Sequence, residues 1–242
     1  MNKPRLTNNL EKLDEAGSYY SDGLVLLPVI KQSKLIEVLN TLMDEPPREN
    51  YFWEKSMNSY ALRPQAYDYG DCILDFLFDN ELPEKIKKYT ERDLILSHIQ
   101  ITKTDPGRSY QDWHRDTYQY SSNSWIGNTP PAHKIIFYPE FKQPEPRLKF
   151  VRGSHRFMLN NSSFDESVIK SFDNEIVMSC NNQVLLFETS LLHAVIPDSY
   201  DYGSIRIIYN FITETQYVRS YSSKDHHKKL HDLYLERLGK RL

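Results

Sequence analysis

Residues 204–211 read Ser-Ile-Arg-Ile-Ile-Tyr-Asn-Phe, an apolar stretch that contains a single charged side chain, Arg206. Because side chains alternate between the two faces of a strand, Ile205 and Ile207 share one face, and Arg206 and Ile208 share the other. The stretch therefore predicts a strand with one apolar face and one face that holds a guanidinium. Such a charge needs a partner, which is a bound anion or, on an edge strand, solvent.

Similar short runs follow one another from Leu94 onward, separated by turn signals such as Asp-Pro-Gly at 105–107. Many short strands divided in this way are typical of a sandwich or barrel. Helical patterns do not alternate with them, which argues against a parallel sheet with crossover helices. The expected strands are Leu94–Thr102, Lys134–Tyr138, Leu148–Val151, Glu175–Met178, Val184–Phe187, Ala194–Ile196 and Ile205–Ile212.

Helical patterns flank this β-rich region on both sides. A short strand over 23–28 precedes helical patterns over 31–43, 72–78 and 82–89, and an apolar stripe over 222–240 predicts a C-terminal helix. We therefore expect one domain over 1–242, mainly β with flanking helices. Its expected parts are a helical N-terminal part over about 1–93, a β core over about 94–215 and the C-terminal helix over about 222–240.

The composition is that of an ordinary globular protein, with 39% hydrophobic and 26% charged residues. A net charge of −3 argues against a nucleic-acid-binding chain. No apolar run approaches the roughly 20 residues of a membrane span, and the first residues lack a signal-peptide stretch. Two cysteines far apart in sequence favour a cytoplasmic location. The sequence sets no oligomeric state.

His114-Arg115-Asp116 is the strongest chemical motif. In an extended segment, His114 and Asp116 point to the same face and can bind one metal ion. A third ligand must come from elsewhere, and His193, at the start of an expected strand, is the best candidate. Two histidines and one carboxylate are typical of non-haem Fe(II) oxygenases. Taken singly, a surface His–Asp pair and a hydrogen-bonded core histidine are the alternatives.

The order of these features resembles that of Fe(II)/2-oxoglutarate-dependent dioxygenases: H-x-D, a distal His, and an Arg on the next strand. Two further stretches, Tyr19–Pro28 and Arg147–His155 with its Gly-Ser-His, resemble the phytanoyl-CoA dioxygenase branch. The resemblance runs from about residue 17 to 215. It departs from the family pattern at Arg152, where a proline is usual, and at Val195, where relatives often have a serine.

This resemblance implies a double-stranded β-helix, a jelly-roll or cupin-like barrel, as the β core. It also implies that the catalytic residues His114, Asp116 and His193 hold Fe(II). The presence of Asp116 favours hydroxylation, because halogenating relatives lack this carboxylate.

The resemblance further implies that 2-oxoglutarate and O₂ are cosubstrates. Arg206 would bind the distal carboxylate of 2-oxoglutarate with its planar fork. Gln100 and Thr102 lie on the strand before the H-x-D motif and are candidates for further cosubstrate contacts. Exposed polar positions on a mixed strand are the alternative for these two residues.

The substrate class rests on charge alone. Residues 103–156 hold nine Lys or Arg against five Asp or Glu. Basic loops around a barrel mouth favour a small anionic metabolite, and a solvated charged face is the alternative. Two other functions stay open: a catalytically inactive jelly-roll binding domain, and a cupin metalloprotein without 2-oxoglutarate, which would leave Arg206 without a role.

Overall fold

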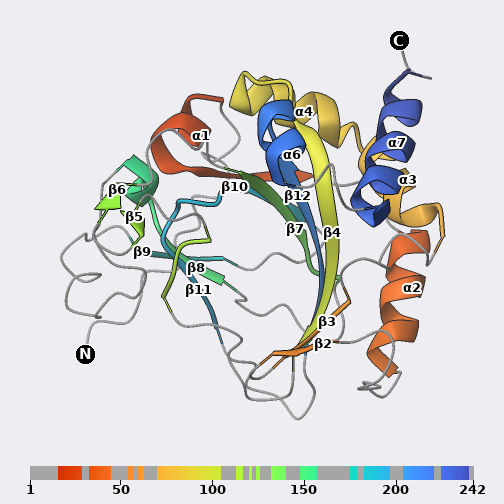
Figure 1. Cartoon of the computed structure of the whole chain (residues 1–242). Helices are drawn as coiled ribbons and strands as arrows, with labels where there is room; N and C mark the ends of the chain where they lie inside the picture. Colours follow the sequence, from red (N-terminus) through yellow and green to blue (C-terminus); the bar gives the residue numbers. More distant parts are fainter. Residues whose placement is uncertain are drawn as a thin grey trace.

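The computed structural model consists of antiparallel sheets with helices packed around them (Figure 1). The structure describes residues 16–28, 33–44, 54–56, 59–62, 70–104, 113–116, 120–121, 124–125, 132–139, 148–156, 175–178, 183–196, 204–220 and 225–239.

The larger sheet has seven strands in the order β1-β10-β7-β12-β4-β3-β2. Their bounds are β1 (Leu24–Pro28), β10 (Gln183–Glu188), β7 (His133–Phe137), β12 (Ser204–Ile212), β4 (Ile95–Thr104), β3 (Ser59–Leu62) and β2 (Glu54–Ser56). The stretch around Arg206 is thus a central strand, paired with β7 on one side and β4 on the other. The edge-strand alternative for Arg206 is therefore wrong.

The smaller sheet has the order β11-β8-β9 and packs against the inner face of the larger one. Its strands are β11 (His193–Val195), β8 (Leu148–Val151) and β9 (Glu175–Met178), and a separate hairpin joins β5 (Tyr120–Ser121) to β6 (Ser124–Trp125). Phe150 and Val195 from the smaller sheet meet Phe187 and Ile208 from the larger sheet in one apolar cluster. Two such sheets closing on each other form the expected double-stranded β-helix.

Helices cover the outer face of the larger sheet (Figure 1). Ile205, Ile207, Tyr209 and Phe211 of β12 all lie in the cluster between sheet and helices, which confirms the alternation expected for this strand. The Tyr209 hydroxyl also donates a hydrogen bond of 2.8 Å to the carbonyl of Ile73. The helices are α1 (Ala16–Asp22), α2 (Ser33–Asp44), α3 (Cys72–Asp79), α4 (Leu82–Thr90), α6 (Glu214–Ser220) and α7 (Asp225–Gly239).

The N-terminal part differs from the expectation, because β2 and β3 join the larger sheet in addition to the expected strand β1. The strand expected over 23–28 begins at Leu24, and the residues before it are helical up to Asp22. Gly23 makes this break: its φ of +82° suits glycine, and a Cβ there would lie 2.6 Å from Nδ1 of His155. The helix α6, after β12, was not expected either.

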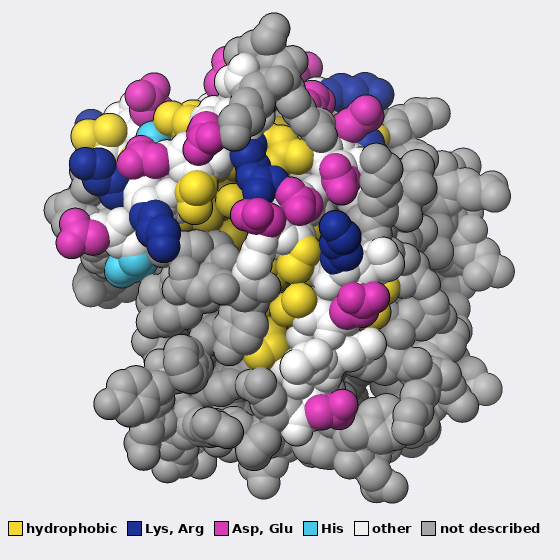
Figure 2. All heavy atoms as spheres, turned by 90° about the vertical axis from the view of Figure 1, so that its right-hand side faces the viewer, with side chains coloured by type: hydrophobic (Ala, Val, Ile, Leu, Met, Phe, Trp, Pro, Cys, Tyr) yellow, Lys and Arg dark blue, Asp and Glu magenta, His cyan; other side chains and the backbone are white. Residues whose placement is uncertain are grey.

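The side of the molecule covered by α4, α6 and α7 carries a groove of about 590 Å³. Apolar side chains such as Leu235 and Leu238 line it together with Glu84 and Arg92. On the described residues of this side, Figure 2 shows acidic and basic side chains interspersed around the apolar ones. None of the described helices combines the length and apolar composition that crossing a bilayer requires.

Candidate metal centre

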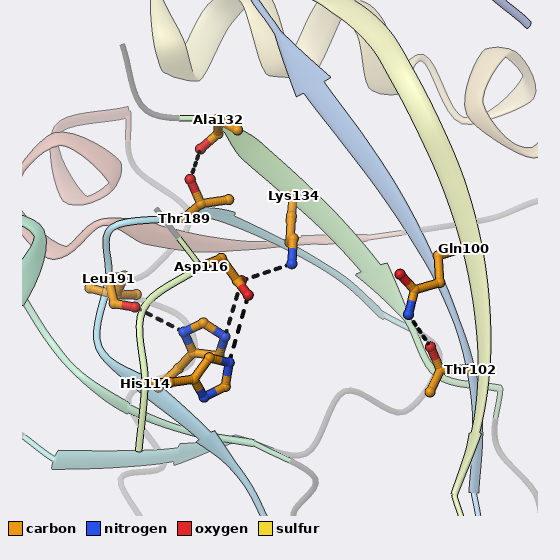
Figure 3. A network of polar contacts seen from close by, with 9 residues as sticks. Gln100, Thr102, His114, Asp116, Ala132, Lys134, Thr189 and Leu191 are labelled. Atoms are coloured by element: carbon orange, nitrogen blue, oxygen red, sulfur yellow. Dashed lines mark hydrogen bonds and ion pairs between the residues drawn. The ribbon is translucent and has the colours of Figure 1, made fainter. Parts of the chain in front are cut away.

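Backbone pairing places the two predicted histidine ligands next to each other. The amide N–H of His114 donates to the carbonyl of His193 at 2.9 Å, and the reverse bond measures 3.0 Å. Their ring centroids lie 4.2 Å apart. The amide of Asp116 donates to the carbonyl of Thr189 at 2.9 Å, which fixes the carboxylate beside both rings (Figure 3).

The three side chains converge on one point. His114 Nε2 lies 3.7 Å from Oδ1 of Asp116, and His193 Nε2 lies 3.4 Å from Oδ2. One donor atom from each residue lies within 4.8 Å of the others, and no other group of three or more such residues occurs in the described part of the chain. A single ion could contact all three donors.

The hydrogen bonds of His193 fit a metal ligand. Nδ1 of His193 donates to the carbonyl of Leu191 at 2.8 Å, so the ring keeps a lone pair on Nε2, which faces Asp116. Burial lowers the pKa of His193, against the opposing effect of the Asp116 charge, so the ring is neutral at pH 7. The lone pair on Nε2 of His193 and the carboxylate oxygen of Asp116 are both acceptors, and a cation between them would stabilise this arrangement.

Lys134, on β7, also contacts this carboxylate. Its Nζ lies 2.8 Å from Oδ2 of Asp116, and Figure 3 shows the two side chains pointing toward each other. Burial alone would raise the pKa of Asp116. The positive charge of Lys134 is the largest effect that opposes burial, and the pKa of Asp116 lies well below its usual range. Asp116 is therefore ionised at neutral pH.

A cavity of about 210 Å³ connects the three side chains to Arg206. His114, Asp116 and His193 line it together with Gln100 and Arg206. Apolar side chains complete its wall, among them Ile136, Leu148, Phe187 and Ile208.

Thr102 lies beside this cavity, opposite Arg206 in the pairing of β4 with β12. Its hydroxyl accepts a hydrogen bond of 2.8 Å from the Gln100 amide (Figure 3). The structure therefore brings five of the six predicted site residues to one cavity and places the sixth, Thr102, against its wall.

Arg206 is buried, with 3% of its surface exposed. Its Nη1 donates to the hydroxyl of Tyr138 at 3.1 Å, and its guanidinium carbon lies 5.8 Å from the centroid of the Tyr138 ring. A buried guanidinium on a cavity wall is a ready partner for a carboxylate, because its planar fork matches carboxylate geometry.

The Gly-Ser-His segment forms hydrogen bonds with the residues next to two of the metal-ligand candidates, His193 and His114. The Ser154 hydroxyl accepts a bond of 2.8 Å from the amide of Leu192, and the Ser154 carbonyl accepts one of 2.6 Å from Arg115. Arg115 thus points away from the cavity, as alternation between His114 and Asp116 requires. Burial lowers the pKa of Arg115 to about 10, partly offset by Glu188, which leaves it charged at pH 7.

Sequence reasoning did not single out Lys134 and Tyr138 as site residues. The signal for Lys134 was the same as the signal for Arg206: one charged residue inside an apolar strand, Lys-Ile-Ile-Phe, on the face that also holds Ile136. Nothing in the sequence marked Tyr138 as the partner of Arg206, because their pairing follows from the register of β7 against β12.

Several solved structures share this fold, among them proteins with bound iron or with bound nickel and 2-oxoglutarate. EctD from S. alaskensis with bound Fe has a TM-score of 0.63 at 14% identity, over 82% of this chain and 75% of that one. HygX from Streptomyces hygroscopicus, with nickel and 2-oxoglutarate bound, gives 0.61 at 14% identity, over 86% and 88%. SnoK, a non-heme alpha ketoglutarate dependent carbocyclase from nogalamycin biosynthesis, gives 0.60 at 13% identity, over 84% and 85%.

At these identities the likeness establishes the fold. The chain spans about half of one further match, EvdMO1, covering 49% of that structure at 18% identity and a TM-score of 0.59. No family model and no curated protein sequence matches the chain.

Proposed function

We propose that this protein is an Fe(II)- and 2-oxoglutarate-dependent dioxygenase that hydroxylates a C–H bond of a small anionic metabolite. The observation that carries the proposal is the convergence of His114, Asp116 and His193 on a cavity that Arg206 also lines. The shared fold with EctD, HygX and SnoK supports it.

The three donor residues favour an iron site with open coordination positions over a structural metal site in which protein side chains fill every position. Two imidazoles and one carboxylate bind a ferrous ion on one side and leave other positions open for ligands. When bound, Fe(II) and 2-oxoglutarate together supply the activation of O₂ that oxidation of a C–H bond requires. The protein holds the ion through His114, Asp116 and His193, and excludes bulk water with the apolar wall around them.

Arg206 binds the distal carboxylate of the 2-oxo acid in this proposal, and Tyr138 holds the guanidinium in place. Gln100 supplies an amide on the cavity wall for a further hydrogen bond, while Thr102 orients that amide. The buried guanidinium of Arg206 is suited to a carboxylate of this dicarboxylate cosubstrate. A cupin metalloprotein without a cosubstrate would give Arg206 no such role.

Cavity size and sequence charge support the substrate class. Arg206 on the cavity wall is assigned to the cosubstrate, and Lys134, the other cationic side chain among the described lining residues, contacts Asp116. A cavity of about 210 Å³ suits a small molecule or one reactive end of a larger one. The excess of basic over acidic residues in the sequence of segment 103–156 favours the same substrate class.

The test is aerobic incubation of the protein with Fe(II), ascorbate and 2-oxoglutarate, with succinate as the product measured. Succinate formation that is lost in Asp116→Asn supports the proposal, because turnover uncoupled from a primary substrate already needs the metal and the cosubstrate. Metal binding at the three residues without succinate formation would favour the cupin metalloprotein. The absence of both would favour a binding domain.

A further inference from the structure

Lys134 lies beside the carboxylate that would bind the metal ion, where a second positive charge is electrostatically unfavourable. Its Nζ lies 2.8 Å from Oδ2 of Asp116, and its side chain is only 18% exposed. The strand register places Lys134 between Phe187 on β10 and Asn210 on β12, and Asp116 is the carboxylate it contacts among the described residues. An ammonium in this position lies beside any ion that the three ligands hold.

The charge of Lys134 has opposite effects on the binding of a metal ion and on the binding of a carboxylate. A divalent ion bound by Asp116 would be repelled by Lys134, so the lysine weakens metal binding. A carboxylate arriving next to that ion would be attracted by the same lysine. Because the site is partly desolvated, both effects are larger than they would be in water.

The spacing along β12 places the two cations at separate ends of the cavity. Asn210, the strand partner of Lys134, lies four residues along β12 from Arg206, which is about 13 Å at ~3.3 Å per residue. Each cation reaches into the cavity with a long side chain, so the gap between the charged groups is shorter than this. A dicarboxylate can therefore meet one cation at each end.

We propose that Lys134 binds the carboxylate of the 2-oxo acid nearest the metal and does so at the expense of metal affinity. Lys134 is thus a specificity-determining residue for a dicarboxylate, paired with Arg206 at the other end. Without ligands, Lys134 neutralises Asp116. This inference rests on the proposed function, since it takes 2-oxoglutarate as the ligand.

The experiment uses Ni(II) as a metal probe without turnover, under anaerobic conditions, with binding measured by isothermal titration calorimetry. Ni(II) is titrated into the free protein, and 2-oxoglutarate is then titrated into the Ni(II)-saturated protein. Lys134→Met removes the charge and keeps the length of the side chain. Relative to the wild type, it should bind Ni(II) about tenfold more tightly and 2-oxoglutarate about tenfold more weakly.

Two further variants make the result specific. Lys134→Arg keeps the charge and should change neither affinity as much as Lys134→Met does. Lys149→Met removes one lysine from β8, where Nζ lies over the Trp113 ring at 4.6 Å, and should change neither affinity. Circular dichroism and a thermal melt establish that each variant is folded before the titrations are compared.

The outcomes separate the two proposals. Opposite changes in the two affinities for Lys134→Met support this inference. Changes of the same sign mean a structural role for Lys134 and overturn it, as do unchanged affinities. If the wild type binds no Ni(II), or binds it as well as Asp116→Asn does, then the metal site and the proposed function fail, independently of Lys134.

Discussion

The backbones of His114 and His193 are hydrogen-bonded to each other in both directions, at 2.9 and 3.0 Å. This pair joins the short segment 113–116 to β11 in the smaller sheet. Because main-chain atoms make the connection, the spacing of the two imidazoles does not depend on the side chains themselves. The site can thus lose one ligand side chain and keep its backbone frame.

Asp116→Asn tests this separation of site and frame. The amide keeps the volume and the backbone bond to Thr189 but removes the charge, so metal binding and 2-oxoglutarate turnover should collapse. Lys134 loses its carboxylate partner, which should cost about 1–3 kcal/mol of unfolding free energy. Metal content, succinate and denaturant curves measure these three effects.

The matched control for that change is Asp22→Asn. Asp22 pairs with Arg152 at 3.3 Å and does not line the cavity, so this variant should keep metal binding and turnover. Full succinate formation by Asp116→Asn would show that Asp116 is not a ligand.

Arg206→Ala should raise the concentration of 2-oxoglutarate required for turnover while metal binding changes little. Removing one member of a desolvated charge pair costs about 2–5 kcal/mol, or roughly 30- to 4,000-fold in affinity. Arg206→Lys should restore only part of this, because an ammonium cannot make the planar fork. Titrations of 2-oxoglutarate against each variant measure the effect.

Tyr138→Phe provides the graded comparison. It removes only the 3.1 Å bond that holds the guanidinium, so its effect on the 2-oxoglutarate titration should be smaller than that of Arg206→Ala. Superimposable curves for the wild type and Arg206→Ala would reject the dioxygenase interpretation and favour a binding domain.

Ser154→Ala should destabilise the protein without removing the metal site. The Ser154 hydroxyl accepts the amide N–H of Leu192, and a buried amide left without an acceptor costs about 1–3 kcal/mol. Ser97→Ala is the matched control, since its hydroxyl donates to the carbonyl of Asn210 and its loss strands no N–H group. We expect a smaller loss of unfolding free energy for Ser97→Ala, and Ni(II) affinity within about threefold of the wild type for both variants.

Local patterns predicted most of the strands. Alternation gave β12 and β4 within two residues at each end, because each has one face in the sheet–helix cluster and one toward the cavity. The strands β2 and β3 were missed, since a short hairpin joined to a sheet edge is determined by its pairing with β4 rather than by its own sequence.

The site was predictable only in part, and for a physical reason. The spacing of His114 and Asp116 predicted that they share a site, and a single charge in an apolar strand predicted that Arg206 belongs to it. The contact of Lys134 with Asp116 arises from the approach of segment 113–116 to β7, which no local pattern encodes. Long-range pairing of this kind determines which charges neutralise one another, and so it determines the electrostatics of the site.

His133, next to Lys134 on β7 and pointing to the opposite face, should make stability depend on pH. It is 3% exposed, and its Nδ1 lies 2.6 Å from the Tyr19 hydroxyl, with which it shares a hydrogen bond. Burial, with a smaller effect of Arg92, lowers the pKa of His133 to about 3. In the unfolded chain the pKa of histidine is about 6.5, so between these values the unfolded chain binds a proton that the folded chain does not. The free energy of unfolding should therefore be unaffected by this group above pH 6.5, and should fall by up to about 1.4 kcal/mol for each pH unit from 6.5 toward 3.

Denaturant unfolding of the wild type and of His133→Gln measures this contribution. The free energies are compared at half-unit steps between pH 4.5 and 8, roughly the window in which histidine titrates, and the contribution of His133 is the difference between the two curves. A difference that stays constant across this range would show that His133 takes up its proton equally well in the folded protein.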